Sequence, residues 1–373
     1  MRILFVGDEA SLPAELSEYI ADLGEDWHTT SVADGHSAMA AVAGSPLDAV
    51  IVSPNLSDMD ATTLLGQIRT LRPETIRVAL IDAQQGNRAP PARLIDIAHR
   101  FLPLPLAPEV LLEALSSLEE LRELLDSPRL RDAIGRIEKL PSPPHLYMSL
   151  TRALEHDEDA DSNEVAKLVS ADPAIAAKVL QLSNSAYFSS GRTISDLRGA
   201  VTRLGLATLR DLVLASEVFS APTLSVAERN SLQQRALLAS RLAARLLPAS
   251  SAELGSTAAL LADIGLLLPG VRNERSEPAD AADARPGHAE AGAYLLGLWG
   301  LPMPIVEAVG FHLQPQRSNT RSFWVTGAVH VALALVNGEA VDEDYLQRAN
   351  VLHKLPEWRE HANALMGLSP AEA

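Results

Sequence analysis

The 373-residue sequence predicts an α/β doubly wound domain over residues 1–108, followed by an all-α helical bundle over residues 132–340. The first prediction rests on short apolar runs that alternate with amphipathic segments, a pattern typical of a parallel sheet covered by helices on both faces. The second rests on a long succession of segments with helical periodicity and no strand-like alternation. Residues 109–131 are predicted as a linker helix, and residues 341–373 as a partly helical C-terminal tail.

Composition narrows the classes of function. Hydrophobic residues make up 47% of the chain and aromatic residues only 4%, so the core must consist of Leu, Ala and Val, which favours helices. The net charge of −17 argues against nucleic acid or anionic lipid as partners, because proteins bind phosphate groups through clusters of Lys and Arg. The absence of cysteine excludes Cys-ligated zinc and iron–sulfur clusters. No apolar run reaches the roughly 18 residues of a membrane span, and no signal-peptide cleavage site follows the N-terminus, so a cytoplasmic location is expected.

Three apolar runs are predicted to be strands of the first domain. They cover residues 2–7, 47–53 and 76–82. Ligands of doubly wound sheets bind at the carboxyl ends of the strands. Functional groups of this domain are therefore expected just after each run.

The residues after these strands resemble those of a known family. Gly7-Asp8-Glu9 follows the first strand, and Ser53-Pro-Asn-Leu-Ser-Asp-Met-Asp follows a later one. Together with the order of elements, these stretches resemble the receiver domain of two-component response regulators, over the whole of residues 1–108. In that family an Asp ending the third strand is phosphorylated, and an acidic pair after the first strand holds Mg²⁺. A Thr or Ser follows the fourth strand and a Lys follows the fifth.

Carried over by position, most of these groups are missing here. The phosphoacceptor falls on Ser53, whose neutral hydroxyl is a poor acceptor, and the acidic pair falls on Gly7 and Asp8, with Glu9 adjacent. The Thr or Ser falls on Asp82, which would repel a phosphoryl group, and the Lys falls on Leu104.

An alignment slip does not explain the loss of the lysine, because the first lysine of the chain is Lys139. The sequence thus predicts a pseudo-receiver that serves for docking or dimerisation, or that merely helps the second domain to fold and stay soluble. A divalent ion held by Asp8, Glu9 and Asp82 is a further alternative.

The segment that follows is predicted to be an amphipathic helix. Its apolar residues are spaced three and four apart, and glutamates lie between them. Packing against the receiver-like sheet is the expected use of its apolar face, and pairing with a second copy is the alternative. The apolar positions are Val110, Leu111, Leu115, Leu118, Leu121 and Leu125.

The second domain opens with two well-marked helices. Asp172 and Pro173 begin the first, Asn184 closes it, and Gly205 is the expected breaker of the next, which starts near Ile194. These stretches, with Lys139-Leu-Pro-Ser-Pro-Pro before them, resemble an HDOD domain, an all-helical module related to metal-dependent HD phosphohydrolases. The resemblance implies a regulatory protein without hydrolase activity that joins two-component and cyclic-dinucleotide signalling.

HD phosphohydrolases hold one or two divalent ions with His and Asp side chains from successive helices, and the ions lower the pKa of a bound water. Leu260-Leu-Ala-Asp-Ile-Gly resembles their signature helix, but Ala262 stands in place of the His before Asp263. Arg235 stands where an earlier His is expected, while His288 and His312 occupy places of ligand histidines. We therefore expect no metal and no cofactor. Asp263 is predicted to be an internal partner, for example of Arg235, and His288 a helix-start residue.

The leading hypothesis is a non-catalytic bacterial signal-transduction adaptor. Its partners would be a sensor kinase, a response regulator or a diguanylate cyclase, and a homodimer is a further option. A residual metal-dependent phosphodiesterase using Asp263, His288 and His312 is the first alternative. A cyclic-dinucleotide sensor is the second alternative. Its candidate anion contacts are Arg192, Arg198, Arg203 and Arg210.

Residues 272–286, rich in charged residues, Ala and Pro, are predicted to form a mobile loop.

Overall fold

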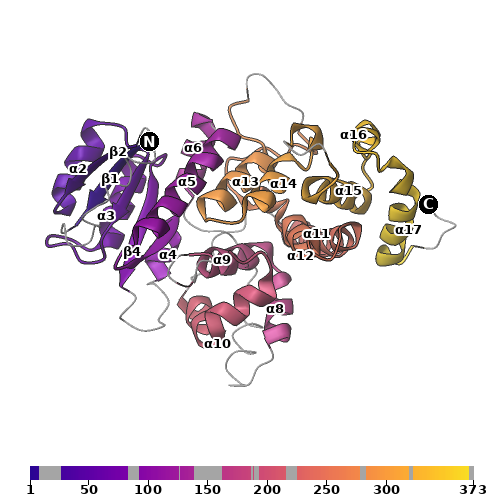
Figure 1. The fold of residues 1–373 in the computed structure, drawn as a ribbon, viewed down its shortest axis with the longest axis horizontal. Coiled ribbons are helices and arrows are strands. Elements are labelled where there is room, and N and C mark those ends of the chain that lie inside the picture. The colour runs from indigo at the N-terminus through magenta and orange to yellow at the C-terminus, as the bar shows by residue number, and fades with distance from the viewer. Residues whose placement is uncertain are drawn as a thin grey trace.

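The structure is a computed structural model of the chain. It describes residues 1–7, 27–82, 92–125, 127–137, 162–185, 188, 193–215, 225–277, 283–318 and 322–368. Figure 1 shows the sheet at the N-terminal end of the molecule and the helical part at the C-terminal end, with α5 and α6 between them.

A five-stranded parallel sheet forms the first domain, in the order β2-β1-β3-β4-β5. This flavodoxin-like order confirms the predicted α/β doubly wound class. Three strands coincide with the predicted apolar runs, and the buried β5 lies at one edge. β2 has no apolar run because it lies at the other edge of the sheet, where most of its side chains are partly or fully exposed. The strands are β1 (Arg2–Val6), β2 (His28–Val32), β3 (Ala49–Val52), β4 (Ile76–Asp82) and β5 (Arg100–Leu104).

Helices α2 (Gly35–Gly44), α3 (Ala61–Leu71) and α4 (Ala92–Ile97) belong to the same domain. Asp34 and Asp60 each accept a backbone N–H of the following turn, which fixes where α2 and α3 begin. The peptide bond from Leu104 to Pro105 is cis.

Helix α5 (Pro108–Leu125) packs within its own chain on both sides, so it is shared by the two domains rather than being a free linker. Glu119 accepts a hydrogen bond from the Trp27 indole, and Arg122 pairs with Asp48 at 3.0 Å, which ties α5 to the sheet domain. Its predicted apolar face is buried, and Leu121 lies against Gly297 of α13. Helix α6 (Pro128–Gly135) follows.

The remaining described elements are helical, as predicted. Asp172 Oδ1 accepts the N–H groups of Ala174 and Ile175 at the start of α9, and Gly205 breaks the helical geometry of α10 at a φ of 74°. The elements are α8 (Ser162–Ser170), α9 (Pro173–Ser183), α10 (Leu197–Ala215), α11 (Val226–Leu246), α12 (Ala252–Leu261), η3 (Ile264–Leu267), α13 (His288–Leu298), α14 (Met303–Phe311), η4 (Pro315–Arg317) and α15 (Val325–Asn337).

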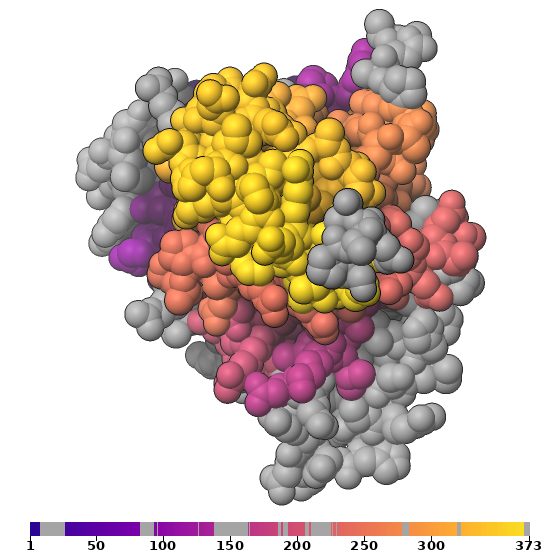
Figure 2. Space-filling view, turned by 90° about the vertical axis from the view of Figure 1, so that its right-hand side faces the viewer, coloured from indigo at the N-terminus to yellow at the C-terminus, as the bar shows by residue number. Residues whose placement is uncertain are grey.

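The C-terminal residues form α16 (Glu343–Arg348), η5 (Leu352–Lys354) and α17 (Leu355–Met366). Helix α17 contacts α11 and α15, and a small apolar cluster around Tyr345 and Trp358 joins this region to α15. Figure 2 shows these residues, in yellow, in the upper part of the face turned to the viewer. They pack as part of the bundle rather than as a loose tail.

Buried polar contacts join the two domains. Arg100, at the start of β5, donates hydrogen bonds to the carbonyls of Leu298 and Gly297 at the end of α13 and to Ala114 and Ser117 of α5. These carbonyls carry the partial negative charge of a helix C-terminus, which favours a guanidinium there. Within the described residues, no helix has the length and apolar character needed to cross a bilayer.

Candidate functional site

Three of the predicted receiver positions lie together at one edge of the sheet, where the strands have their carboxyl ends. Ser53, Asp82 and Leu104 directly follow or end three neighbouring strands, and Asp82 pairs in register with Leu104. Of the three carboxylates considered for a divalent ion, the structure describes only Asp82, because Asp8 and Glu9 lie outside the described residues.

Gly7 and Ser53 touch at this edge. Gly7 has a φ of 136°, and a Cβ atom added to it would lie 2.5 Å from Ser53 Cβ. Such a backbone disfavours any other residue, so an acidic side chain has no room at this position. Leu104 supplies no ammonium group. The edge therefore keeps the geometry of a receiver sheet without its phosphoacceptor carboxylate or its lysine.

A second cluster forms in the helical domain. Asp263 follows α12, His288 is the first residue of α13, and His312 follows α14. All three are buried, with exposed fractions of 6%, 0% and 1%. Their ligand atoms lie within 4.8 Å of one another, so the structure brings together the three metal-ligand positions inferred from the sequence.

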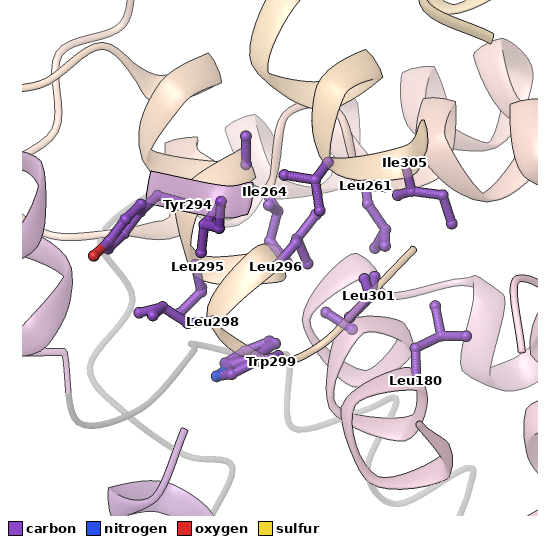
Figure 3. Close-up of a cluster of buried hydrophobic side chains, with 14 of the residues drawn as sticks. Leu180, Leu261, Ile264, Tyr294, Leu295, Leu296, Leu298, Trp299, Leu301 and Ile305 are labelled. Atoms are coloured by element: carbon purple, nitrogen blue, oxygen red, sulfur yellow. The ribbon is translucent and has the colours of Figure 1, made fainter. Parts of the chain in front are cut away.

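Apolar packing fixes the backbone around this cluster. Leu261 and Ile264, which flank Asp263, point into the group of buried side chains contributed by α13 (Figure 3). Gly265 allows the turn after Asp263 to approach the start of α13, because a Cβ there would lie 1.9 Å from the carbonyl oxygen of His288. Asp263 and His288 are thus held by rigid parts of the core.

The centre of the cluster is occupied by the guanidinium of Arg275. Its Nη1 donates to Asp263 Oδ1 at 2.5 Å and lies 3.2 Å from His288 Nε2, and its Nη2 donates to His312 Nε2 at 3.1 Å. Its Nε faces Glu339 Oε1 at 3.0 Å. A planar cation with several fixed donors therefore contacts every group that could ligate a metal in this cluster. We call these residues, Asp263, Arg275, His288 and His312, the Arg275 centre.

Two expectations from the sequence are wrong here. Arg235 is not the partner of Asp263: its Nη1 donates to Ser231 Oγ on its own helix, and Arg275 takes the role. The described parts of the predicted mobile loop are held in place, because Arg272 pairs with Gly287 and the backbone of His288. Residues 278–282 lie outside the described residues.

The two histidines differ in their tautomers, which their partners determine. His312 Nδ1 donates to the carbonyl of Val309 at 2.8 Å, so its Nε2 carries a lone pair. His288 Nδ1 accepts the N–H of Glu274 at 3.2 Å, so its proton lies on Nε2 and points toward Asp263 Oδ1, 3.5 Å away. His288 consequently presents an N–H, not a lone pair, to the centre.

Burial and charge shift the pKa values of these groups. Burial by itself raises the pKa of Asp263, but its contacts with His288 and His312 and the charge of Arg275 outweigh burial and hold that pKa well below its ordinary value. Burial lowers the pKa of His312, although Asp263 opposes the shift. Asp263 is therefore ionised and His312 neutral near pH 7. The one negative charge of Asp263 then pairs with the one positive charge of Arg275.

These donors do not fit a catalytic metal. Ligating histidines donate their other ring nitrogen to a carboxylate or carbonyl, as His312 does, whereas His288 has the opposite arrangement. A metal would also have to share the space with the Arg275 guanidinium, whose positive charge repels it. Another cluster that could hold an ion, Asp34, His36 and Asp58, lies on the exposed surface of the sheet domain.

The family comparison agrees with the helical architecture. The model of the HDOD domain family matches residues 140–315. Residues 140–315 are an HDOD domain. The Arg275 centre lies within this domain, and its companion Glu339 lies beyond the matched residues.

The chain is also similar to several individual proteins. A relative from Treponema pallidum (strain Nichols), described as an uncharacterized protein, is 29% identical over 201 residues, or 48% of this chain and 38% of the relative, so the chain spans well under half of that protein's length. The MmoQ response regulator from Methylococcus capsulatus is 19% identical, with a TM-score of 0.46, over 58% of this chain and 97% of that one. A virulence factor from Campylobacter jejuni is 18% identical, also with a TM-score of 0.46, over 68% and 97% of the two chains.

A receiver domain of an HD domain-containing protein from Pseudomonas fluorescens Pf-5 is 26% identical, with a TM-score of 0.27, over 33% of this chain and 88% of that one.

Sequence reasoning missed Arg275 and Glu339. Arg275 lies in a charged stretch that carries no periodicity, and it reaches the HDOD core only because the strand-like pairing of Arg272 with Gly287 places it there. The one available signal was the charge balance of the centre, since a buried carboxylate with two neutral imidazoles requires a cation.

Proposed function

We propose that the protein is a non-catalytic signal-transduction adaptor, in which the receiver-like sheet and the HDOD domain act through their surfaces. An HDOD domain joined to a receiver-like domain suggests a signalling protein. The observation that carries the non-catalytic part is the Arg275 guanidinium, which lies among Asp263, His288 and His312. With this cation in place, no lone-pair set remains to bind an ion that would activate water.

The sheet domain supports the same proposal. Without a carboxylate at Ser53 or an ammonium at Leu104, it offers a receiver-shaped surface that does not depend on phosphorylation. The proposed partners are a sensor kinase, a response regulator or a diguanylate cyclase, in a pathway that includes two-component or cyclic-di-GMP signalling. Self-association into a homodimer belongs to the same proposal.

Two measurements on the full chain test the proposal. Elemental analysis after purification in the presence of Mn²⁺, Fe²⁺ or Zn²⁺ should find no stoichiometric metal. Incubation with cyclic di-GMP and with bis(p-nitrophenyl) phosphate should give no turnover above buffer. Turnover that disappears in His312→Ala, but persists in a surface control such as His353→Ala, would establish the phosphodiesterase instead.

A direct test of partners uses the full chain as bait and purified candidates of the three classes as prey. Saturable binding of at least one candidate is expected. Absence of binding to all three classes, together with phosphoester turnover, would reject the adaptor.

One observation favours a second candidate function, the sensing of an anionic ligand. Lys167, Arg198 and Arg241 line a groove of about 440 Å³ between α8, α10, α11 and α12, and none of them forms an ion pair within the described residues. Asp196 and Glu253 also line the groove, so the cations exceed the carboxylates by one. Of the other arginines considered from the sequence, Arg203 is engaged with the carbonyl of Ser183.

Arg192 and the side chain of Arg210 lie outside what the structure describes. Calorimetric titration with cyclic di-GMP decides this candidate, because the absence of heat removes it. Heat that is lost in Arg198→Ala supports it.

A further inference from the structure

A cavity lies between the two domains, away from both the receiver edge and the Arg275 centre. Its volume is about 390 Å³, within the range of small-molecule sites. One wall comes from β5 and α5, and the other from the end of α9 and residues 299–303, which join α13 to α14. Figure 1 shows α5, α9 and α13 meeting in this region. A molecule bound here would contact both domains at once.

The floor of the cavity is apolar. Trp299, Leu301 and Met303 line it from the HDOD side, and Phe101 from the sheet domain. Figure 3 shows Trp299 at the end of the α13 cluster and Leu301 between that cluster and Leu180 of α9. The Trp299 ring already has a cation near it, since Lys178 Nζ lies 5.0 Å from the ring centroid. Indole rings attract cations through their negative face.

Three acceptor groups of the lining have no hydrogen-bond donor within the described residues, whereas Ser117, Asn184 and Ser185 have partners. Glu113 and Glu120, on the exposed side of α5, take part in no ion pair or hydrogen bond within the described residues. Gln181 is 1% exposed; its Nε2 donates to the carbonyl of His99, but its Oε1 is buried without a partner. A buried acceptor without a partner is unusual and costs free energy.

Burial lowers the pKa of Arg100, the one guanidinium in the lining, and the charge of Glu113 opposes that shift, but Arg100 has no hydrogen-bond donor left for these groups. Each nitrogen of Arg100 already donates to a carbonyl or to Ser117 Oγ. The carboxylates at the mouth therefore face a cavity whose own cation is fully engaged. A ligand that fits this lining must bring positive charge and N–H donors at one end and apolar surface at the other.

We propose that this cavity binds an organic cation, a molecule with an ammonium or guanidinium group on an apolar body. The charged group lies between Glu113 and Glu120, and the apolar body rests on Trp299 and Met303. Because the walls belong to different domains, binding stabilises their docked arrangement. This site is independent of the adaptor proposal, since it uses neither the receiver edge nor the Arg275 centre.

The test uses 2-phenylethylamine as the probe and isothermal titration calorimetry of the full chain at 150 mM salt. The neutral 2-phenylethanol and the anionic 3-phenylpropionate have similar bodies without the positive charge. We expect saturable one-site binding of the amine, at least tenfold weaker binding of the alcohol, and no binding of the acid. No heat with the amine at millimolar concentration, or equal affinity for the alcohol, would overturn the proposal.

Two double variants locate the site. Glu113→Gln with Glu120→Gln removes both cavity carboxylates. Glu109→Gln with Glu123→Gln removes the same charge from exposed positions of the same helix that do not line the cavity.

We expect the first double variant to weaken amine binding at least tenfold and the second to change it less than twofold. Equal weakening in both would show nonspecific attraction to an acidic protein and reject the site. As a second readout, the saturating amine should raise the Tm of the wild type and of the control variant, but not that of the cavity variant.

Discussion

Arg275 Nη1 lies 2.5 Å from Asp263 Oδ1, inside the HDOD domain. The pair is mostly buried, with side-chain exposures of 15% for Arg275 and 6% for Asp263. Both partners also contact the imidazoles of His288 and His312: Arg275 donates to His312 Nε2, and the N–H of His288 points toward Asp263 Oδ1.

Replacement of Arg275 should destabilise the fold. Arg275→Met leaves the buried carboxylate of Asp263 without its partner, and breaking a buried pair in this way costs about 3–5 kcal/mol. Urea unfolding at pH 7 measures the loss. The double variant Asp263→Asn with Arg275→Met should recover part of it, because no uncompensated charge remains. The exposed Arg129 provides the control, as Arg129→Met should change stability little. A neutral effect of Arg275→Met would contradict the described centre.

Replacement of Arg100 should loosen the contact between the domains. Arg100→Met leaves the carbonyl of Leu298 without its donor, at a cost of about 1–3 kcal/mol if that group stays buried, and removes one of the donors to the carbonyls of Gly297 and Ala114. Arg100→Lys should not restore stability, since one ammonium cannot reach partners that the fork of a guanidinium spans. Hydrogen exchange should show lost protection at the C-terminal end of α13 and in the middle of α5, around Ala114 and Ser117. Protection equal to that of the wild type would show that Arg100 does not hold the interface.

Restoring the acceptor alone should not restore phosphorylation. Ser53→Asp supplies a carboxylate, but the position of the lysine still holds Leu104, and Gly7 leaves no room for an acidic side chain. Intact-mass analysis after incubation with acetyl phosphate and Mg²⁺ should show no added phosphoryl group in the wild type or in Ser53→Asp. A stable gain of one phosphoryl group in the wild type within residues 1–108 would refute the pseudo-receiver interpretation.

Stability should fall on mild acidification. Burial lowers the pKa of His99 well below its ordinary value of 6.5, and it also lowers the pKa of His312 and His330. Below about pH 6.5 the unfolded chain takes up protons that the folded chain excludes, so the free energy of unfolding declines as the pH drops toward the folded pKa values.

Urea titrations between pH 7.5 and pH 5 measure this decline. His99→Asn keeps an acceptor near the position of Nδ1 but does not titrate, so it should flatten the decline. A pH-independent wild type would contradict the assignment of these buried neutral histidines.

Much of the fold could be predicted from the sequence because its signals are local. The apolar runs of β1, β3 and β4, the cap at Asp172 and the break at Gly205 each depend on a few neighbouring residues. β2 was missed because an edge strand need not be apolar. Asp263, His288 and His312 were located by their motifs, but their partner Arg275 was not, since its placement depends on loop pairing distant from any periodic element. The packing of α5 against α13 was not predicted, because a repeat of leucines does not reveal which neighbours cover it.

Helix α13 connects two features that lie far apart in the sequence. It begins at His288, in the Arg275 centre, and its last carbonyls accept hydrogen bonds from Arg100 of the sheet domain. Its 11 residues span about 16 Å at the usual rise per residue. Because α13 is hydrogen-bonded at both ends, we expect a displacement of β5 to move His288 as well. Helix α13 therefore links the sheet domain directly to the Arg275 centre.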